Sequence, residues 1–178
     1  MCRILTSKKM KKVILSVVAV FVFGFANAQE AKFGLKAGVD FANAHGKLDG
    51  SSYNNAETGF YAGGFVDITV SDKFHVQPEL LYVSVNDLDQ IQIPVLAKFP
   101  VVEDLSLLAG PDFGFLLDAG EGSKTLNFGL DLGLSFDLNE EFSLDGKYNF
   151  GLSNLVEGGN NDFSSKLSGF FFGLSYKF

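Results

Sequence analysis

The chain has 178 residues, enough for one domain, and it is rich in Gly and Phe, with 20 of each, while Trp is absent. Its formal net charge of −7 argues against nucleic acid as a partner. It contains no run of about 18 consecutive apolar residues, so a membrane protein built from spanning helices is not expected.

Residues 1–28 have the layout of a secretory signal peptide. Lysines between positions 8 and 12 form a basic region, residues 13–25 are apolar, and Ala26-Asn27-Ala28 supplies the small residues of a cleavage site. The alternative is a membrane anchor, but the apolar stretch is too short to span a bilayer. We therefore expect a cleaved signal peptide at residues 1–28 and a mature domain at residues 29–178, whether translation starts at Met1 or at Met10.

Cleavage at this position changes the charge and the chemistry of the chain. It removes five basic residues and no acidic ones, which takes the net charge from −7 to −12. It also removes Cys2, the only cysteine, so the mature chain has no disulfide, thiol nucleophile or thiolate metal ligand. Because no cysteine follows the apolar stretch, we expect no lipid anchor at the mature N-terminus.

Segments of the mature chain alternate between apolar residues and small or polar ones, which is the period of a strand with one apolar face. We predict eight strands, at residues 33–43, 58–70, 73–85, 90–99, 105–117, 126–138, 141–154 and 167–178. The alternation is clearest in 126–138, where every even position is large and apolar and every odd position is small or polar. Strands of soluble proteins usually have about 5–6 residues, whereas roughly 9–11 tilted residues cross a bilayer. The pattern therefore predicts membrane-spanning strands.

Prolines interrupt the three middle strands, at Pro78, Pro94 and Pro111. Proline removes a donor from the hydrogen-bond ladder and is normally found at edges and bulges. A bulge at any of them would reverse the face that the following residues occupy. The strands themselves are predicted, and the facing of their residues is left open.

The predicted connections alternate in length. Short acidic turns near residues 71–72, 102–104 and 139–140 alternate with a brief connection at 86–89 and longer polar ones at 44–57, 118–124 and 155–166. Short turns at one rim and longer loops at the other are typical of outer-membrane barrels, whose short turns face the periplasm. The predicted fold class is all-β, an eight-stranded antiparallel up-and-down transmembrane β-barrel preceded by a cleaved signal peptide. The three longer loops are expected outside the cell.

The alternation alone does not say which face meets lipid, because a soluble lipocalin-like barrel turns its apolar face inward around a ligand. The polar face suits the narrow interior of an eight-stranded barrel, since it carries glycines and charges of both signs. These charges are Lys36, Asp40, Asp67, Glu79, Lys98, Asp112, Asp131, Asp145 and Lys147. Because an isolated buried charge is costly, Asp131 and Lys147 are predicted to form a pair.

Aromatic residues fall near both ends of the predicted strands, as in the girdles at the two membrane interfaces. One group would lie at the short-turn rim: Phe33, Phe74, Phe99, Phe142 and Phe178. The other would lie toward the long-loop rim: Phe41, Phe60, Tyr82, Phe115, Phe128, Phe150 and Phe170. Together with the charged face, they favour a barrel with lipid outside over a soluble barrel with a ligand inside.

Five segments, which together span most of the mature chain, carry a family resemblance. They are IQIPVLAKF at 91–99, AGPDFGFLL at 109–117, GLDLGLSFDL at 129–138, LDGKYNFGLSNL at 144–155 and the terminal FFFGLSYKF. The chain resembles the small outer-membrane β-barrel proteins that are called porin-family or PorT-like. This resemblance implies a barrel in the outer membrane of a Gram-negative-type cell envelope. It implies no catalytic, cofactor-binding or metal-binding residue, because the family has no shared catalytic motif.

Two histidines are the candidates for acid–base chemistry. His45 lies in the connection 44–57 and is the only such group expected on the outer side, where a solvated histidine is the favoured interpretation. An enzymatic role would require that His45→Ala abolish an activity. His75 shares its face with Gln77 and Glu79, and we expect it to form an interior hydrogen bond rather than to bind a ligand.

No metal or cofactor site is predicted. Two separated histidines without a cysteine give no recognisable ligand spacing. Loop acids could hold Ca²⁺ in principle, but Asp118 with Glu121, and Glu157 with Asp162, match no calcium-loop pattern and are interpreted as solvated.

Three functions from different classes follow from these observations. The favoured one is a monomeric structural or interaction barrel that sits in outer-membrane lipid and presents its loops to an extracellular protein or surface partner. The second is a narrow pore for ions or small solutes, disfavoured because eight strands leave a filled interior. The third is an enzyme.

Overall fold

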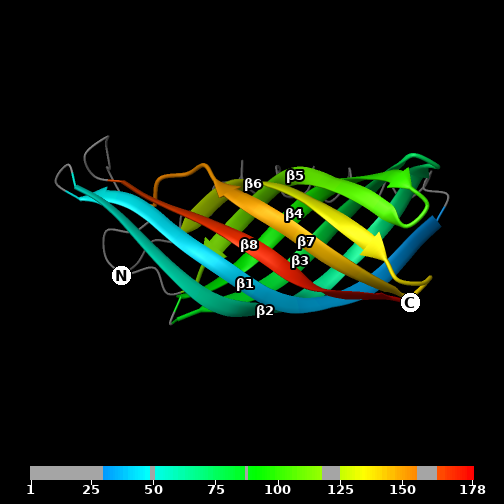
Figure 1. The fold of residues 1–178 in the computed structure, drawn as a ribbon, viewed down its shortest axis with the longest axis horizontal. Helices are drawn as coiled ribbons and strands as arrows, with labels where there is room; N and C mark the ends of the chain where they lie inside the picture. The colour runs from blue at the N-terminus through cyan, green and yellow to red at the C-terminus, as the bar shows by residue number, and fades with distance from the viewer. Residues whose placement is uncertain (1–29, 49–50, 87, 118–124, 156–163) are drawn as a thin grey trace, which may run out of the picture.

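The computed structural model describes residues 30–48, 51–86, 88–117, 125–155 and 164–178. Here eight antiparallel strands form a closed barrel, in which each strand pairs with the next and β8 pairs with β1 (Figure 1). The strands are β1 (Glu30–Leu48), β2 (Ser51–Ser71), β3 (Phe74–Val85), β4 (Leu88–Val102), β5 (Leu105–Leu116), β6 (Leu126–Asp137), β7 (Phe142–Gly151) and β8 (Ser164–Lys177). The predicted barrel is confirmed. The predicted signal peptide, loop 118–124 and most of loop 155–166 lie outside the described residues.

The short turns and the C-terminus share one rim, at the right-hand end of Figure 1. The terminal residue closes onto the first strand there, since Phe178 N donates to Phe33 O at 2.9 Å. At the opposite rim, β3 and β4 are joined by a tight turn in which Asn86 has φ 40°. Asn is among the residues that tolerate this left-handed conformation. Within the described residues, no helix is long and apolar enough to span a membrane.

The prolines do not reverse the facing of the middle strands. The β2–β3 register is the same before and after Pro78, from Phe65↔Glu79 to Ile68↔Val76. Pairing of β4 with β5 likewise keeps its register across Pro94 and Pro111. The register irregularities lie instead next to the short turns, at Thr69/Ser71 and Pro100/Val102. Residues of β3, β4 and β5 therefore point alternately outward and inward along each strand. The outward side chains include Leu80, Ile93 and Leu107, and the buried ones include Glu79, Gln92 and Leu108.

The prediction of a loop at residues 44–57 is wrong, because β1 and β2 continue through it as a paired hairpin. Their register runs without a break to Leu48↔Ser51. The predicted first strand ends at Asn43 because the alternation of apolar residues stops there. Backbone pairing does not need that alternation. The missed signal is the Asp49-Gly50 dipeptide, which favours a two-residue hairpin turn.

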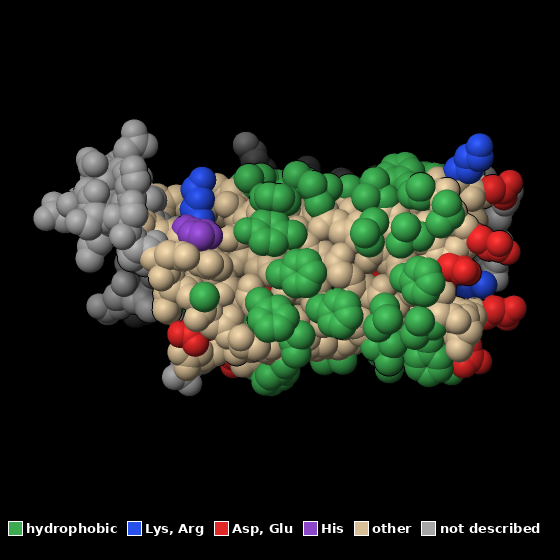
Figure 2. Space-filling model, in the orientation of Figure 1, with side chains coloured by type: hydrophobic (Ala, Val, Ile, Leu, Met, Phe, Trp, Pro, Cys, Tyr) green, Lys and Arg blue, Asp and Glu red, His purple; other side chains and the backbone are tan. Residues whose placement is uncertain are grey.

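The outer wall is apolar along its whole height between the rims. Alternate residues of β6 from Leu126 to Phe136 are all exposed, and the equivalent positions on the other strands are Phe, Leu, Val or Ile at many places. Figure 2 shows these side chains covering the middle of the visible face, with acidic and basic side chains gathered at the short-turn end. In the predicted short-turn girdle the ring centroids of Phe74 and Phe99 lie 5.2 Å apart. In the predicted long-loop girdle the ring of Phe128 lies 5.4 Å from that of Phe113, a neighbour that was not predicted to belong to the girdle. The soluble lipocalin-like alternative is therefore wrong, since its apolar face would point inward.

Candidate functional site

A network of buried charges crosses the barrel interior between β1, β3, β6 and β7. Lys36 Nζ lies 2.6 Å from Glu79 Oε1 and 2.9 Å from Asp145 Oδ2. Lys147 Nζ lies 2.8 Å from Asp131 Oδ2 and 3.5 Å from Glu79 Oε2. Glu79 therefore bridges the two lysines, and each of the five side chains is nearly or fully buried. We call these five residues the central network.

Side-chain amides donate to carboxylate oxygens of this network and of the neighbouring Asp112. Asn149 Nδ2 donates to Asp131 Oδ1 at 2.6 Å and to Asp112 Oδ2 at 2.9 Å. Gln77 Nε2 donates to Glu79 Oε1 at 2.7 Å. Buried charges are tolerated when they are both paired and hydrogen-bonded. The central network therefore forms a paired and hydrogen-bonded charged layer across the lumen.

An apolar cluster lies beside the charges, and it consists of Tyr61, Leu81, Val83, Val85 and Phe171. The rings of Tyr61 and Phe171 meet edge to face at 5.4 Å, and Lys147 Nζ lies 5.1 Å from the centroid of Phe171. Tyr61 fits only because the facing wall has a glycine, since a Cβ on Gly173 would overlap the Tyr61 hydroxyl. Charged and apolar side chains thus fill the middle of the barrel together.

This apolar cluster was not predicted from the sequence. Three of its members, Leu81, Val83 and Phe171, come from the runs Leu80-Leu81-Tyr82-Val83 and Phe170-Phe171-Phe172, in which both faces of a strand are apolar. In a run of consecutive apolar residues, the inward-facing residues cannot be distinguished from the lipid-facing ones by their polarity. The available signal was the loss of alternation itself, which indicates a strand whose two faces are both covered.

A polar cavity of about 340 Å³ opens at the short-turn rim. Its wall includes His75, whose Nδ1 lies 2.8 Å from Asp67 Oδ1, and Lys98, whose Nζ lies 3.5 Å from Asp67 Oδ2. The predicted interior hydrogen bond of His75 is confirmed. Thr69 Oγ1 lies 3.4 Å from the same Nδ1. A catalytic triad uses the two ring nitrogens for different partners, so this arrangement does not activate the hydroxyl.

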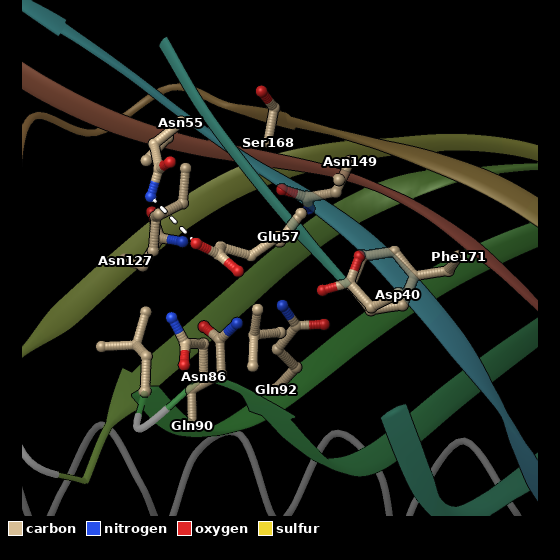
Figure 3. Close-up of a pocket in the computed structure, with 16 residues that line it drawn as sticks. Asp40, Asn55, Glu57, Asn86, Gln90, Gln92, Asn127, Asn149, Ser168 and Phe171 are labelled. Carbon is tan, nitrogen blue, oxygen red and sulfur yellow. Dashed lines mark hydrogen bonds between the residues drawn. The ribbon is translucent and has the colours of Figure 1, made fainter. Parts of the chain in front are cut away.

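The long-loop end of the interior holds a second cavity, of about 170 Å³, which we call the outer vestibule (Figure 3). Its polar lining consists of Asp40, Asn55, Glu57, Asn86, Gln90, Gln92, Asn127, Asn149 and Ser168. Its apolar lining consists of Ala42, Ala44, Val85, Leu88, Leu167 and Phe171, with Gly169 completing the wall. Lys, Arg and His are absent from the described residues around it. Three buried oxygens of the lining, on Asp40, Gln90 and Gln92, have no hydrogen-bond partner.

The inward charges are where the alternation predicts them. All nine predicted inward charges are at most 7% exposed. The predicted pair of Asp131 and Lys147 is confirmed at 2.8 Å, and it is diagonal because Lys147 stands opposite Gly133. His45 is exposed on β1, between Asn54 of β2 and Lys166 of β8. The outer vestibule was not predicted, because its lining residues come from separate strands.

No metal-binding group is formed by the residues that the structure describes: nowhere do three His, Cys, Asp or Glu side chains gather to hold an ion. The loop acids Asp118, Glu121, Glu157 and Asp162 lie outside the described residues, so their predicted solvation stays a prediction.

An apolar outer wall, aromatic girdles and a charged, filled lumen define a transmembrane β-barrel. Residues 14–178 match the model of the outer membrane protein beta-barrel domain family, and the chain belongs to this family. The predicted location in the outer membrane is confirmed, while the narrower PorT-like label stays a prediction.

Solved structures with a similar fold include a de novo designed transmembrane β-barrel and Ail, the attachment invasion locus protein of Yersinia pestis. The designed barrel is 14% identical, with a TM-score of 0.54, and the match covers 85% of this chain and 99% of that one. Ail is 20% identical, with a TM-score of 0.51, and the match covers 84% of this chain and 100% of Ail. At these identities the likeness shows the shared fold. No curated protein matches the chain.

Proposed function

We propose that this outer-membrane barrel is a surface protein that binds a partner outside the cell through a sheet projecting beyond the barrel rim. This outer sheet consists of residues 44–48 of β1, 51–59 of β2 and 164–168 of β8. The observation that carries the proposal is the extent of strand pairing. β1 pairs with β2 as far as Leu48↔Ser51 and with β8 as far as Lys47↔Ser164.

The neighbouring strands stop earlier. Pairing of β2 with β3 begins at Phe60↔Ser84, and pairing of β7 with β8 ends at Asn149↔Gly169. Within the described ranges, residues 51–58 of β2 therefore pair on one side only. An unpaired strand edge offers backbone N–H and C=O groups to an added strand, and adding a strand is a common way to bind an extended segment of another protein.

The filled lumen supports an interaction role over a pore. The central network and the apolar cluster occupy the middle of the barrel, as expected for a barrel of this strand number. The chain also closes its own barrel, which supports a monomer. An enzymatic role has no support among the described side chains, because His75 is held by Asp67 and His45 stands exposed beside Asn54 and Lys166.

Surface presentation predicts one-sided labelling of single cysteines. Asn54→Cys, on the exposed outer sheet, is expected to react with a membrane-impermeant maleimide on intact cells. Asp72→Cys, in the turn between β2 and β3, is the matched control and is expected to react only after lysis. Background labelling by the maleimide is expected to be low, because the predicted removal of residues 1–28 takes away Cys2, the only native cysteine. Labelling of Asp72→Cys on intact cells, with Asn54→Cys protected, would reverse the orientation and contradict the proposal.

Conductance separates the interaction role from the pore. In planar bilayers the folded protein is expected to give no stepwise ion current, because paired lysines and carboxylates fill the lumen. Regular current steps from the unmodified protein would support the pore instead.

A further inference from the structure

We propose that the outer vestibule binds the primary ammonium head of a small organic cation. The first observation is its size. A cavity of about 170 Å³ has room for a compact charged head and a few carbons, and binding pockets for drug-sized molecules are usually larger, at about 300–1,000 Å³. The occupant is therefore a small molecule, or the end of a longer one that enters from the long-loop side.

The second observation is a set of acceptors without donors. Asp40 Oδ1, Gln90 Oε1 and Gln92 Oε1 are buried and have no hydrogen-bond partner. The three residues are 2%, 5% and 3% exposed. Buried polar atoms in native proteins are almost always satisfied, so three orphaned oxygens around one cavity indicate a missing donor. An ammonium group supplies three donors and accepts none.

The third observation is the charge of the lining. Glu57 of β2 stands opposite Ala42 of β1, and Ala42 lies two residues after Asp40 on the same inward face. The carboxylates of Asp40 and Glu57 are therefore diagonal neighbours on adjacent strands. Figure 3 shows the ends of Asp40, Glu57 and Gln92 around the same space. Among the described lining residues there is no basic side chain, and the buried Lys147 of the central network is paired with Asp131 and Glu79. An anion would meet two carboxylates here without a cation to offset them.

The fourth observation is the packing around the key carboxylate and the apolar part of the wall. Asp40 lies against Gly169, where a Cβ would come within 2.5 Å of the orphaned Oδ1, so the glycine leaves room for the carboxylate to turn inward. Phe171, Val85 and Leu88 form the apolar side of the cavity. Such a surface packs against methylene groups, as the stems of lysine side chains do. The vestibule thus combines a charged end with an apolar side, which fits an alkylammonium.

Three probes of equal length but different charge test this proposal on the isotope-labelled barrel in detergent micelles. They are 1,4-diaminobutane, 1,4-butanediol and butanedioate, each titrated at pH 7 and constant ionic strength while backbone amide resonances are recorded. The diammonium is expected to shift amides of Gly169 and its neighbours saturably, with little change at the short-turn rim. Butanediol and butanedioate are expected to give no saturable shift at the same concentrations.

Isosteric variants assign the effect to the carboxylates. Asp40→Asn is expected to weaken the apparent affinity for 1,4-diaminobutane at least tenfold, and Glu57→Gln is expected to weaken it by a smaller factor. Asp67→Asn, which removes an inward carboxylate at the opposite rim, is the matched control and should bind like the unmodified barrel. If Asp40→Asn does not fold, Glu57→Gln decides, because Glu57 is only partly buried. The proposal is overturned if the diol binds as well as the diammonium, if the diammonium gives no saturable shift, or if the folded carboxylate variants bind unchanged.

Discussion

Replacing Lys147 with Met is expected to destabilise the folded barrel by about 3–5 kcal/mol, the usual cost of leaving a buried charge without its partner. Lys147 is 3% exposed and contacts Asp131 at 2.8 Å and Glu79 at 3.5 Å. Methionine nearly matches its length but supplies no positive charge and no donor. The variant therefore leaves two carboxylates in the lumen with less compensation. Urea unfolding in lipid vesicles, followed by far-ultraviolet circular dichroism, measures the change.

Lys166→Met is the matched control for this prediction. This variant also replaces a lysine with methionine, but the side chain of Lys166 is exposed at the outer end of β8. Exposed lysines contribute little to stability, so the control is expected to lie within about 0.5 kcal/mol of the unmodified protein. Equal stabilities for the two variants would mean that the central network does not hold the interior together.

Replacing Leu132 with Arg is expected to cost about 2–4 kcal/mol, the range for a cation on the lipid face near the middle of the bilayer. Leu132 lies in the middle of β6 and is 43% exposed on the apolar wall. The arginine would have to leave its charge in hydrocarbon or distort the lipid around it. Refolding into vesicles of one lipid composition, with urea unfolding as above, gives the stability.

Leu138→Arg tests the same substitution at the membrane interface. Leu138 is on the same face of the chain, directly after the end of β6, at the short-turn rim. The cost of a cation falls to about 0–1 kcal/mol near the interface. A large difference between the two variants therefore reports depth in the bilayer. If Leu132→Arg were no more costly than Leu138→Arg, the middle of β6 would not face lipid.

The features that sequence predicts well here are those with a local period. In β6 the alternation of Leu and Phe with Gly, Asp and Ser is uninterrupted, and it gives the strand, its length and its lipid-facing side at once. The pairing of Asp131 with Lys147 was predictable because a single hairpin turn joins β6 to β7, and that turn sets which residues of the two strands lie side by side. Both depend on residues that are close in sequence.

Features that depend on distant strands were out of reach. Glu79 joins Lys36 to Lys147 across the lumen, and a single strand does not indicate which charges will meet there. The outer vestibule likewise takes Asp40 from β1 and Gln92 from β4. The outer sheet was missed for another reason, since polar residues can pair as strands without any apolar period. Its length comes from backbone pairing with β8 as well as within the hairpin.

The most direct test of the closed transmembrane barrel is heat modifiability on a denaturing gel. Unboiled and boiled samples of the detergent-purified protein are run side by side. We expect the unboiled sample to migrate differently from the boiled one, because a closed barrel with every strand paired to two neighbours resists the detergent until it is heated. Identical migration, together with solubility in the absence of detergent, would contradict both the closure of the barrel and the assignment of its apolar face to lipid.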